Sequence, residues 1–262
     1  MSGPRAAKAL PEVTISESAG VRYLHLGTPW IQGAMRIDDP FAIELEYVRR
    51  MMVWMLLREP TEWTGAHAVQ LGLGAGAITR FCAKRMKMRT TAVELNRRVV
   101  DVCRQWFRLP ADSARFTVLE TDAKSFAADP ARAESADVLS VDLYDHEAAS
   151  PVLDSAEFYR RCFDVVAPGG AMTVNLFGRD ASFATSTRRI AAAFGADAVR
   201  TVQPTREGNT VVLAMKQVTF APLDELARRA ENIETRWQLP ARKWLRMLRP
   251  APGQAATDSA PA

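Results

Sequence analysis

The sequence is poor in residues that form disulfides or bind metals. It has three cysteines and three histidines in 262 residues, and it contains no Cys-x-x-Cys pair and no Cys/His cluster. An odd number of cysteines without paired spacing is typical of buried thiols in a reducing compartment. We therefore expect a cytoplasmic protein that holds no metal and is stabilised by its apolar residues, which make up 48% of the chain.

Long apolar runs are missing as well. Nowhere do about 18 apolar residues follow one another, which is the length that a membrane-spanning helix needs. The first ten residues carry charge but no apolar segment of the kind found in signal peptides. We therefore predict neither a membrane span nor a secretion signal.

A concentration of charge is found in one segment only. The net charge of +4 is otherwise spread along the chain, so we expect no nucleic-acid partner. In the segment 236–249, basic residues accumulate beside Trp237 and Trp244. We interpret this segment as an amphipathic C-terminal helix that packs its apolar side on the domain, with an anionic partner or a membrane surface as the alternative.

One part of the chain has the spacing of a nucleoside-binding unit. An apolar stretch is followed by three glycines, a helical segment and a second apolar stretch that ends at Glu94. Gly72, Gly74 and Gly76 permit a tight turn and a close approach of backbone N–H groups to a ligand. Glu94 follows Gly72 by 22 residues, where a carboxylate can accept both hydroxyls of a ribose. The spacing predicts a site for an adenosine derivative; a tight turn beside a solvated Glu94 is the alternative.

The region around this unit alternates between strand and helix patterns. We predict strands near 67–72, 90–95, 115–120, 137–142 and 171–177, with helices between them, and two final strands near 198–203 and 210–217. Such alternation demands an α/β fold with a doubly wound, mainly parallel, seven-stranded sheet and helices on both faces. Only a short turn separates the last two strands, so they must pair antiparallel. This arrangement matches the methyltransferase variant of the Rossmann-like fold.

The rest of the chain divides into smaller parts. We predict a flexible N-terminus (1–20), an N-terminal β-hairpin and helix (21–60), the nucleoside-binding domain (61–220), C-terminal helices (221–249) and a disordered tail (250–262). The hairpin strands are expected at 21–26 and 30–33, and the helix from Pro40 to about Arg58.

Acidic residues follow the strands, at the edge of the sheet where such folds bind their ligands. Besides Glu94, Asp122 follows the third predicted strand and Asp142 ends the fourth. Asp122 and the backbone of Ala123 are placed to read the amino group of an adenine. A helix N-cap is the alternative for Asp122, and the two roles are compatible.

Asp142 and Asp145 form the chemical centre of the prediction. Two carboxylates three residues apart favour a cation, and one can raise the pKa of the other so that it accepts a proton. An amine that attacks a sulfonium carbon needs such a group. Structural roles in the loop are the alternative, and His146 beside them is either a proton relay or a bystander.

Several short motifs together resemble a known family. They lie at residues 30–33, 36–41, 72–76, 92–95, 121–123, 141–145, 156–159 and 167–170. In this order and spacing the chain resembles the spermidine synthase family of polyamine aminopropyltransferases, over roughly residues 21–217. The resemblance implies transfer of an aminopropyl group from decarboxylated S-adenosylmethionine to an amine or polyamine.

The resemblance also implies roles for single residues. Gln32 would approach the nucleoside, Glu94 would hold the ribose and Asp122 the adenine. Asp142 would act on the attacking amine, with Asp145 alongside. The hairpin and first helix would form the contact of a homodimer.

Two positions depart from the family pattern. Family members carry an Asp in the glycine loop that holds the aminopropyl ammonium group, and here that position is Ala75. Most also carry a Tyr-His/Gln-Glu triplet where this chain has Ile43-Glu44-Leu45. Glu44 and Glu46 remain as cation contacts or as a solvated helix face.

These departures leave two alternatives to aminopropyl transfer. Ala75 would tolerate the carboxylate of intact S-adenosylmethionine, so a methyltransferase is the first alternative. A non-catalytic nucleoside-binding homologue is the second.

Overall fold

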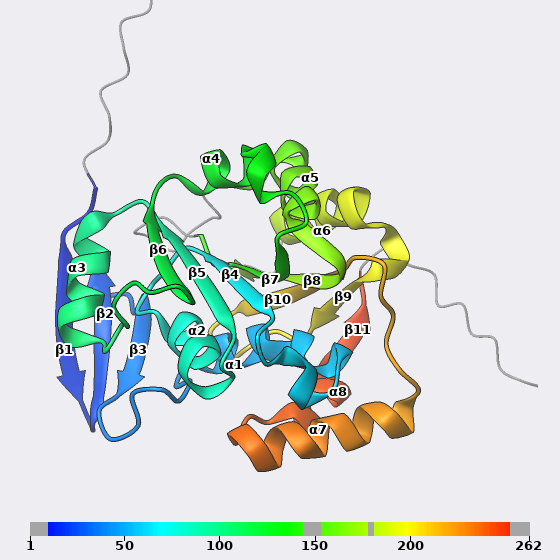
Figure 1. Ribbon diagram of the computed structural model, residues 1–262, viewed down its shortest axis with the longest axis horizontal. Coiled ribbons are helices and arrows are strands. Elements are labelled where there is room, and N and C mark those ends of the chain that lie inside the picture. The colour runs from blue at the N-terminus through cyan, green and yellow to red at the C-terminus, as the bar shows by residue number, and fades with distance from the viewer. Residues whose placement is uncertain (1–9, 144–152, 178–180, 252–262) are drawn as a thin grey trace, which may run out of the picture.

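The computed structural model describes residues 10–143, 153–177 and 181–251. Its main element is a sheet of eight strands in the order β11-β9-β10-β8-β7-β4-β5-β6, shown in Figure 1. The strands are β4 (His67–Leu71), β5 (Arg89–Glu94), β6 (Phe116–Glu120), β7 (Ala136–Val141), β8 (Val166–Phe177), β9 (Val199–Val202), β10 (Asn209–Met215) and β11 (Leu248–Pro250). Strands β4 to β8 are parallel, and β10 is antiparallel to both β8 and β9. The predicted α/β fold with a mainly parallel sheet is confirmed.

Helices cover both faces of this sheet (Figure 1). On one face lie α4 (Ala123–Ala128), α5 (Ala156–Val165) and α6 (Ala181–Phe194). The opposite face is covered by α1 (Glu46–Met51), α2 (Ala77–Arg80), α7 (Leu223–Trp237) and α8 (Ala241–Met247). In β10, alternate residues enter the apolar cores on the two faces of the sheet, as for Leu213 and Val212. This double burial explains why the strands read as nearly continuous apolar runs.

A smaller antiparallel sheet precedes the main one. It consists of β1 (Val13–Ser18), β2 (Val21–Leu26) and β3 (Gly33–Arg36), and it packs with α3 (Arg97–Trp106). The predicted hairpin is present, but its second strand begins at Gly33 rather than Trp30. The prediction of an irregular N-terminus is wrong for residues 13–18, because Val13 and Ile15 of β1 pack against the core beside α3.

The first predicted helix begins later than expected. Helical structure starts at Glu46, not at Pro40, and continues as the 3-10 segment Met52–Leu57. The carbonyl of Pro40 accepts a bond from the Arg80 side chain, at 2.9 Å. The carbonyl of Ile43 likewise accepts a bond from the Arg49 side chain, and the residues before Glu46 form an irregular segment that leads into the helix.

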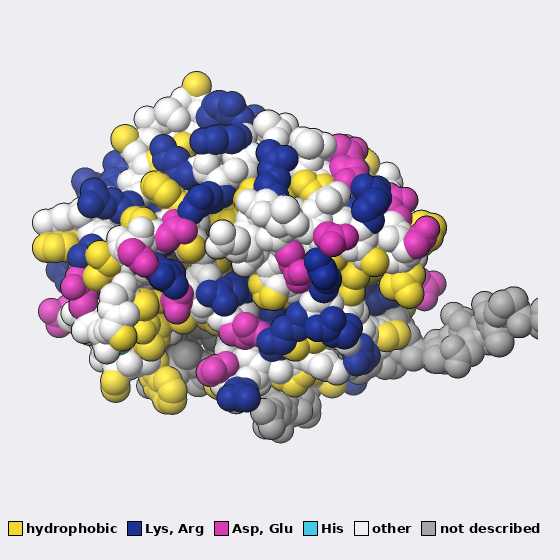
Figure 2. Space-filling model, turned by 90° about the horizontal axis from the view of Figure 1, so that it is seen from below, with side chains coloured by type: hydrophobic (Ala, Val, Ile, Leu, Met, Phe, Trp, Pro, Cys, Tyr) yellow, Lys and Arg dark blue, Asp and Glu magenta, His cyan; other side chains and the backbone are white. Residues whose placement is uncertain are grey.

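The C-terminal segment folds onto the domain in three pieces. The predicted single helix over 236–249 is instead the end of α7, the separate helix α8 and the edge strand β11, which adds an eighth strand to the seven predicted. Trp244 of α8 is fully buried. Seen from below, the protein shows basic and acidic side chains side by side (Figure 2). The C-terminal helices form the ion pairs Arg229 with Glu225, Arg242 with Glu234 and Lys243 with Glu46.

Two further predictions concern the C-terminal tail and membrane-spanning helices. The predicted disordered tail lies outside the described residues, apart from Pro250 and Ala251. In the part of the chain that the structure describes, no helix is long and apolar enough to cross a membrane.

Candidate active site

The glycine loop connects β4 to α2 at the carboxyl edge of the sheet. The N–H of Gly72 donates to the carbonyl of Val93, at 2.9 Å, and so ties the loop to the neighbouring strand. Gly72 has a φ of +84°, and a Cβ there would collide with the carbonyl oxygen of Asp142. Gly76 has a φ of +70°. The loop therefore needs glycine at position 72 both for its turn and for its contact with the segment that follows β7.

The segment before β3 lies directly against the glycine loop. A Cβ added to Gly74 would be 3.0 Å from the carbonyl oxygen of Gln32. A Cβ added to Gly33 would be 2.5 Å from both the Cβ and the amide nitrogen of Ala75. The N-terminal sheet thus supplies one wall of the site.

This close contact can be tested by substitution. We expect Gly33→Ala to lower the free energy of unfolding by about 1–3 kcal/mol and to weaken nucleoside binding, because the new methyl group must displace the loop. Denaturant unfolding and calorimetry measure the two effects. The double variant Gly33→Ala/Ala75→Gly should recover only part of the loss, since the backbone nitrogen at position 75 remains in the way. Unchanged stability of the single variant would contradict the contact.

Glu94 at the end of β5 reaches into the glycine loop. Its Oε2 accepts the N–H of Leu73 at 3.0 Å, and its Oε1 accepts the N–H of Asn96 at 2.8 Å. The side chain is partly buried, and burial raises the pKa of Glu94 above its ordinary value. Glu94 is therefore not the solvated acid of the alternative interpretation, and each carboxylate oxygen keeps a further lone pair for a hydroxyl donor.

Asp122 and Ala123 lie at the start of α4, beyond the end of the adjacent strand β6. Asp122 is the N-cap of this helix, because its Oδ1 accepts the N–H of Ser125 at 2.9 Å. Ala123 is buried. The capping role predicted for Asp122 is confirmed, and the bond uses one of its two carboxylate oxygens.

Asp142 follows β7 and lies at the centre of a hydrogen-bond chain. Its Oδ1 accepts Nδ2–H of Asn175 at 2.9 Å, and its Oδ2 accepts the hydroxyl of Tyr47 at 3.2 Å. The Oδ1 of Asn175 in turn accepts Nδ2–H of Asn209, at 3.2 Å. Burial raises the pKa of Asp142, while the bonds from Asn175 and Tyr47 oppose this change. A carboxylate in this state is suited to accept a proton.

A small pocket joins the glycine loop, the N-terminal segment and Asp142. It is lined by Gln32, Gly33, Ala34, Tyr47, Val48, Gln70, Leu73, Gly74, Ala75, Ala77, Ile78 and Asp142. Asp142 is the one charged side chain among these described lining residues. The pocket therefore favours a positively charged group over an anion.

The remaining residues predicted to contact a ligand either lie outside the described residues or pair with other side chains of the protein. Asp145 and His146 lie outside the described residues. Glu46 bonds with Arg50 at 2.9 Å and with Lys243 at 3.0 Å, and Glu44 lies 3.7 Å from Arg49. Both carboxylates therefore form ion pairs with basic side chains of the protein itself.

Sequence reasoning missed three polar residues of the site. Tyr47 and Asn175 bond to Asp142, and Gln70 lines the pocket from within β4. Asn175 and Gln70 are amide residues in mainly apolar strands, and this signal could have found them. Tyr47 lies one residue after Glu46 and had no comparable signal.

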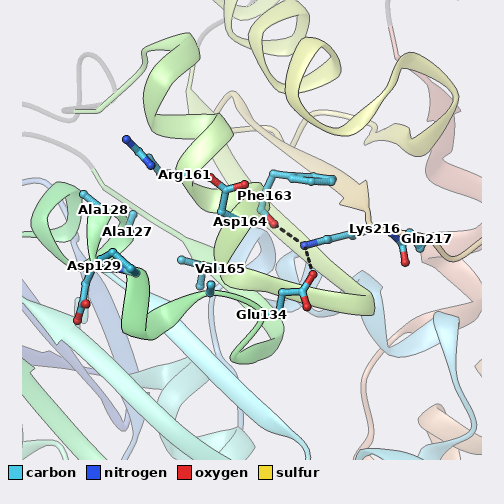
Figure 3. A pocket seen from close by; sticks show the side chains of 12 residues that line it. Ala127, Ala128, Asp129, Glu134, Arg161, Phe163, Asp164, Val165, Lys216 and Gln217 are labelled. Atoms are coloured by element: carbon cyan, nitrogen blue, oxygen red, sulfur yellow. Dashed lines mark hydrogen bonds and ion pairs between the residues drawn. The ribbon is translucent and has the colours of Figure 1, made fainter.

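A second, larger pocket lies at the opposite edge of the sheet, where β7 and β8 begin (Figure 3). Lys216 points into this region, but its Nζ already donates to the carbonyl of Val166 at 2.7 Å, to the carbonyl of Phe163 at 3.1 Å and to Glu134 at 3.3 Å. Lys216 thus satisfies carbonyls near the end of α5. None of the predicted site residues lines this pocket.

No metal centre is found in the ranges that the structure covers, because they contain no group of three or more His, Cys, Asp or Glu side chains placed to hold an ion.

The sheet order and the glycine loop place the protein in the class of Rossmann-like, methyltransferase-type α/β folds. Residues 62–218 match the family model of the spermine/spermidine synthase domain, and the chain belongs to this family.

Individual relatives agree with this assignment. A polyamine aminopropyltransferase from Chromobacterium violaceum is 29% identical over 253 residues, which are 96% of this chain and 94% of that protein. The crystal structure of a probable spermidine synthase from Corynebacterium glutamicum is similar, with a TM-score of 0.69, 19% identity and 88% of each chain covered. Human methyltransferase-like protein 13, solved in complex with SAH, has a TM-score of 0.61 at 22% identity, covering 82% of this chain and 98% of that one.

Proposed function

We propose that the protein transfers an aminopropyl group from decarboxylated S-adenosylmethionine to an amine or polyamine acceptor. The observation that supports this function best is the pocket beside the glycine loop, in which Asp142 supplies the single negative charge among the described lining residues. The near full-length similarity to a polyamine aminopropyltransferase supports the same activity.

The proposed reaction assigns a proton-accepting role to Asp142. The acceptor enters as an ammonium ion, and the Asp142 carboxylate takes one of its protons. The freed lone pair attacks the carbon next to the sulfonium, a new C–N bond forms, and the C–S bond breaks. Methylthioadenosine leaves with the electron pair of that bond. Asp145, which lies outside the described residues, is proposed to supply a second carboxylate for the amine.

The nucleoside part is assigned to the neighbouring strand ends. Glu94 would accept the ribose hydroxyls with the lone pairs that Leu73 and Asn96 leave free. Asp122 would accept an adenine N–H while it caps α4, next to the backbone of Ala123. Gly72, Gly74 and Gly76 would let the loop approach the nucleoside closely.

Calorimetry with decarboxylated and intact S-adenosylmethionine, side by side, tests the proposed substrate. We expect tighter binding of the decarboxylated form, and release of methylthioadenosine when an amine is added. Methyl transfer from the intact form, without methylthioadenosine release from the decarboxylated one, would overturn the proposal.

One observation favours methyl transfer as the second candidate. Position 75 in the glycine loop is an alanine with a buried side chain, so the loop carries no acid there to repel the carboxylate of intact S-adenosylmethionine. The same calorimetric comparison separates the two candidates.

The pH dependence of the proposed reaction offers a further test. Asp142 must be ionised to accept a proton, so the rate should fall as the pH drops through its raised pKa. Asn175→Ala removes a bond that lowers this pKa, and the acidic limb of the rate profile should therefore move to higher pH. The rate measured across pH 4–9 or so checks this shift. Asn209→Ala, which removes only the outer member of the chain, should shift the limb less; an unmoved limb in Asn175→Ala would contradict the role of Asp142.

We also propose a cytoplasmic homodimer that associates through the N-terminal sheet. The cysteines Cys82, Cys103 and Cys162 are buried and free, which supports a reducing compartment. Trp30 and Ile31, next to the N-terminal sheet, are exposed apolar residues. Light scattering on the purified chain tests the dimer, and a monomer at micromolar concentration would contradict it.

A further inference from the structure

Gln32 is held firmly at the wall of the pocket by its backbone. Its N–H donates to the carbonyl of Leu24 at 2.8 Å, which fixes it to β2. Its carbonyl oxygen lies against Gly74, and the next residue, Gly33, lies against Ala75. The side chain of Gln32 therefore starts from a rigid position next to the loop alanine that replaces the family aspartate.

The side-chain amide nitrogen of Gln32 is buried and has no hydrogen-bond partner among the described residues. A buried amide that is left unpaired costs free energy, and a ligand that completes its bonds recovers that cost.

The other glutamine of the pocket differs in this respect. Nε2 of Gln70 donates to the carbonyl of Gly72 at 2.7 Å, and its Oε1 accepts the N–H of Thr79 at 3.1 Å. Both ends of the Gln70 amide are thus used to hold the glycine loop. Of the two glutamines, Gln32 is the one whose amide nitrogen has no partner among the described residues.

The charge of the pocket indicates what this ligand group is. Asp142 attracts a cation, while Ala75 offers no acceptor at the position where an acid would stand. An ammonium group has three N–H donors, so in a buried site it needs acceptors besides one carboxylate. A half-turn of the Gln32 amide exchanges its nitrogen and oxygen, so the unpaired end of this side chain can present an acceptor in place of a donor.

We propose that Gln32 binds the ammonium of the aminopropyl group through its side-chain oxygen, in place of the acid missing at position 75. Gln32 then contributes to selection of decarboxylated over intact S-adenosylmethionine, although it carries no charge. The inference rests on the proposed aminopropyl transfer and departs from a role of Gln32 at the nucleoside.

Binding of three molecules to Gln32 variants tests this assignment. The probes are decarboxylated S-adenosylmethionine, intact S-adenosylmethionine and methylthioadenosine, which keeps the nucleoside but has no ammonium. We expect Gln32→Leu to weaken binding of the decarboxylated molecule by about 10- to 100-fold, which is the usual contribution of a hydrogen bond to a charged group. The affinity for methylthioadenosine should change less than about twofold. Gln32→Glu should tighten binding of decarboxylated S-adenosylmethionine and weaken binding of the intact molecule. Gln105→Leu, at an exposed glutamine of α3, is the matched control and should change nothing.

The outcomes separate this inference from the proposed function. Equal losses for methylthioadenosine and the decarboxylated molecule would overturn the inference, because Gln32 would then bind the nucleoside. Unchanged binding of the decarboxylated molecule by Gln32→Leu would overturn it too. If the unmodified protein fails to bind the decarboxylated molecule, the proposed function itself fails and the inference with it. Thermal unfolding of both variants confirms that they fold.

Discussion

Replacement of Asp142 by asparagine should lower turnover by about 100-fold or more and leave the affinity for the adenosylmethionine-type substrate nearly unchanged. Asparagine keeps the shape of the side chain but loses the basic, anionic oxygen. Its amide oxygen can still accept from Asn175, and the hydroxyl of Tyr47 can turn to accept from the new NH2 group. The fold should therefore survive.

Single-turnover kinetics and calorimetry measure these two effects separately. Asp101→Asn, at an exposed position of α3, is a control for the loss of one carboxylate and should leave turnover unchanged. Turnover of Asp142→Asn near that of the unmodified protein would show that the carboxylate only fastens the loop after β7.

Replacement of Glu94 by alanine should weaken binding of every adenosine derivative by on the order of 2–4 kcal/mol, because two charge-assisted hydrogen bonds to the ribose are lost. Methylthioadenosine and the full substrate should lose affinity in the same proportion, since they share the ribose. Glu94→Gln, which keeps one acceptor oxygen, should lose less.

The neighbouring strand offers a matched control. Glu120 ends β6 next to Glu94 in the sheet register, but it is exposed and pairs loosely with Arg97 at 3.9 Å. Glu120→Ala should leave binding unchanged. If Glu94→Ala binds methylthioadenosine normally, Glu94 serves only to hold Leu73 and Asn96, and the ribose lies elsewhere.

The sheet could be predicted closely because its strands are buried on both faces. In β4 and β7, buried and mainly apolar residues lead directly to the glycine loop and to Asp142. Short or half-exposed elements gave weaker patterns. Strand β1 alternates Val13 and Ile15 with polar residues, and β11 has three residues and directly follows α8, so neither stood out from its surroundings.

The site could be predicted only where its residues follow the strands. Glu94 and Asp142 occupy such positions, and the topology brings them to one edge of the sheet. Tyr47 and Asn175 reach Asp142 from 95 and 33 residues away, through packing of α1 and pairing of β8. Spacing along the chain contains no information about such contacts, which are set by the tertiary structure.

The short strand β11 also affects how the protein behaves in concentrated solution. It covers the outer side of β9, whose N–H and C=O groups would otherwise face solvent at the end of the sheet. Its own outer residues, Arg249 and Pro250, are exposed, and a proline has no N–H with which to extend the ladder. Strand addition from another molecule is therefore disfavoured at this edge, and the sheet is protected there against the intermolecular pairing that starts aggregation.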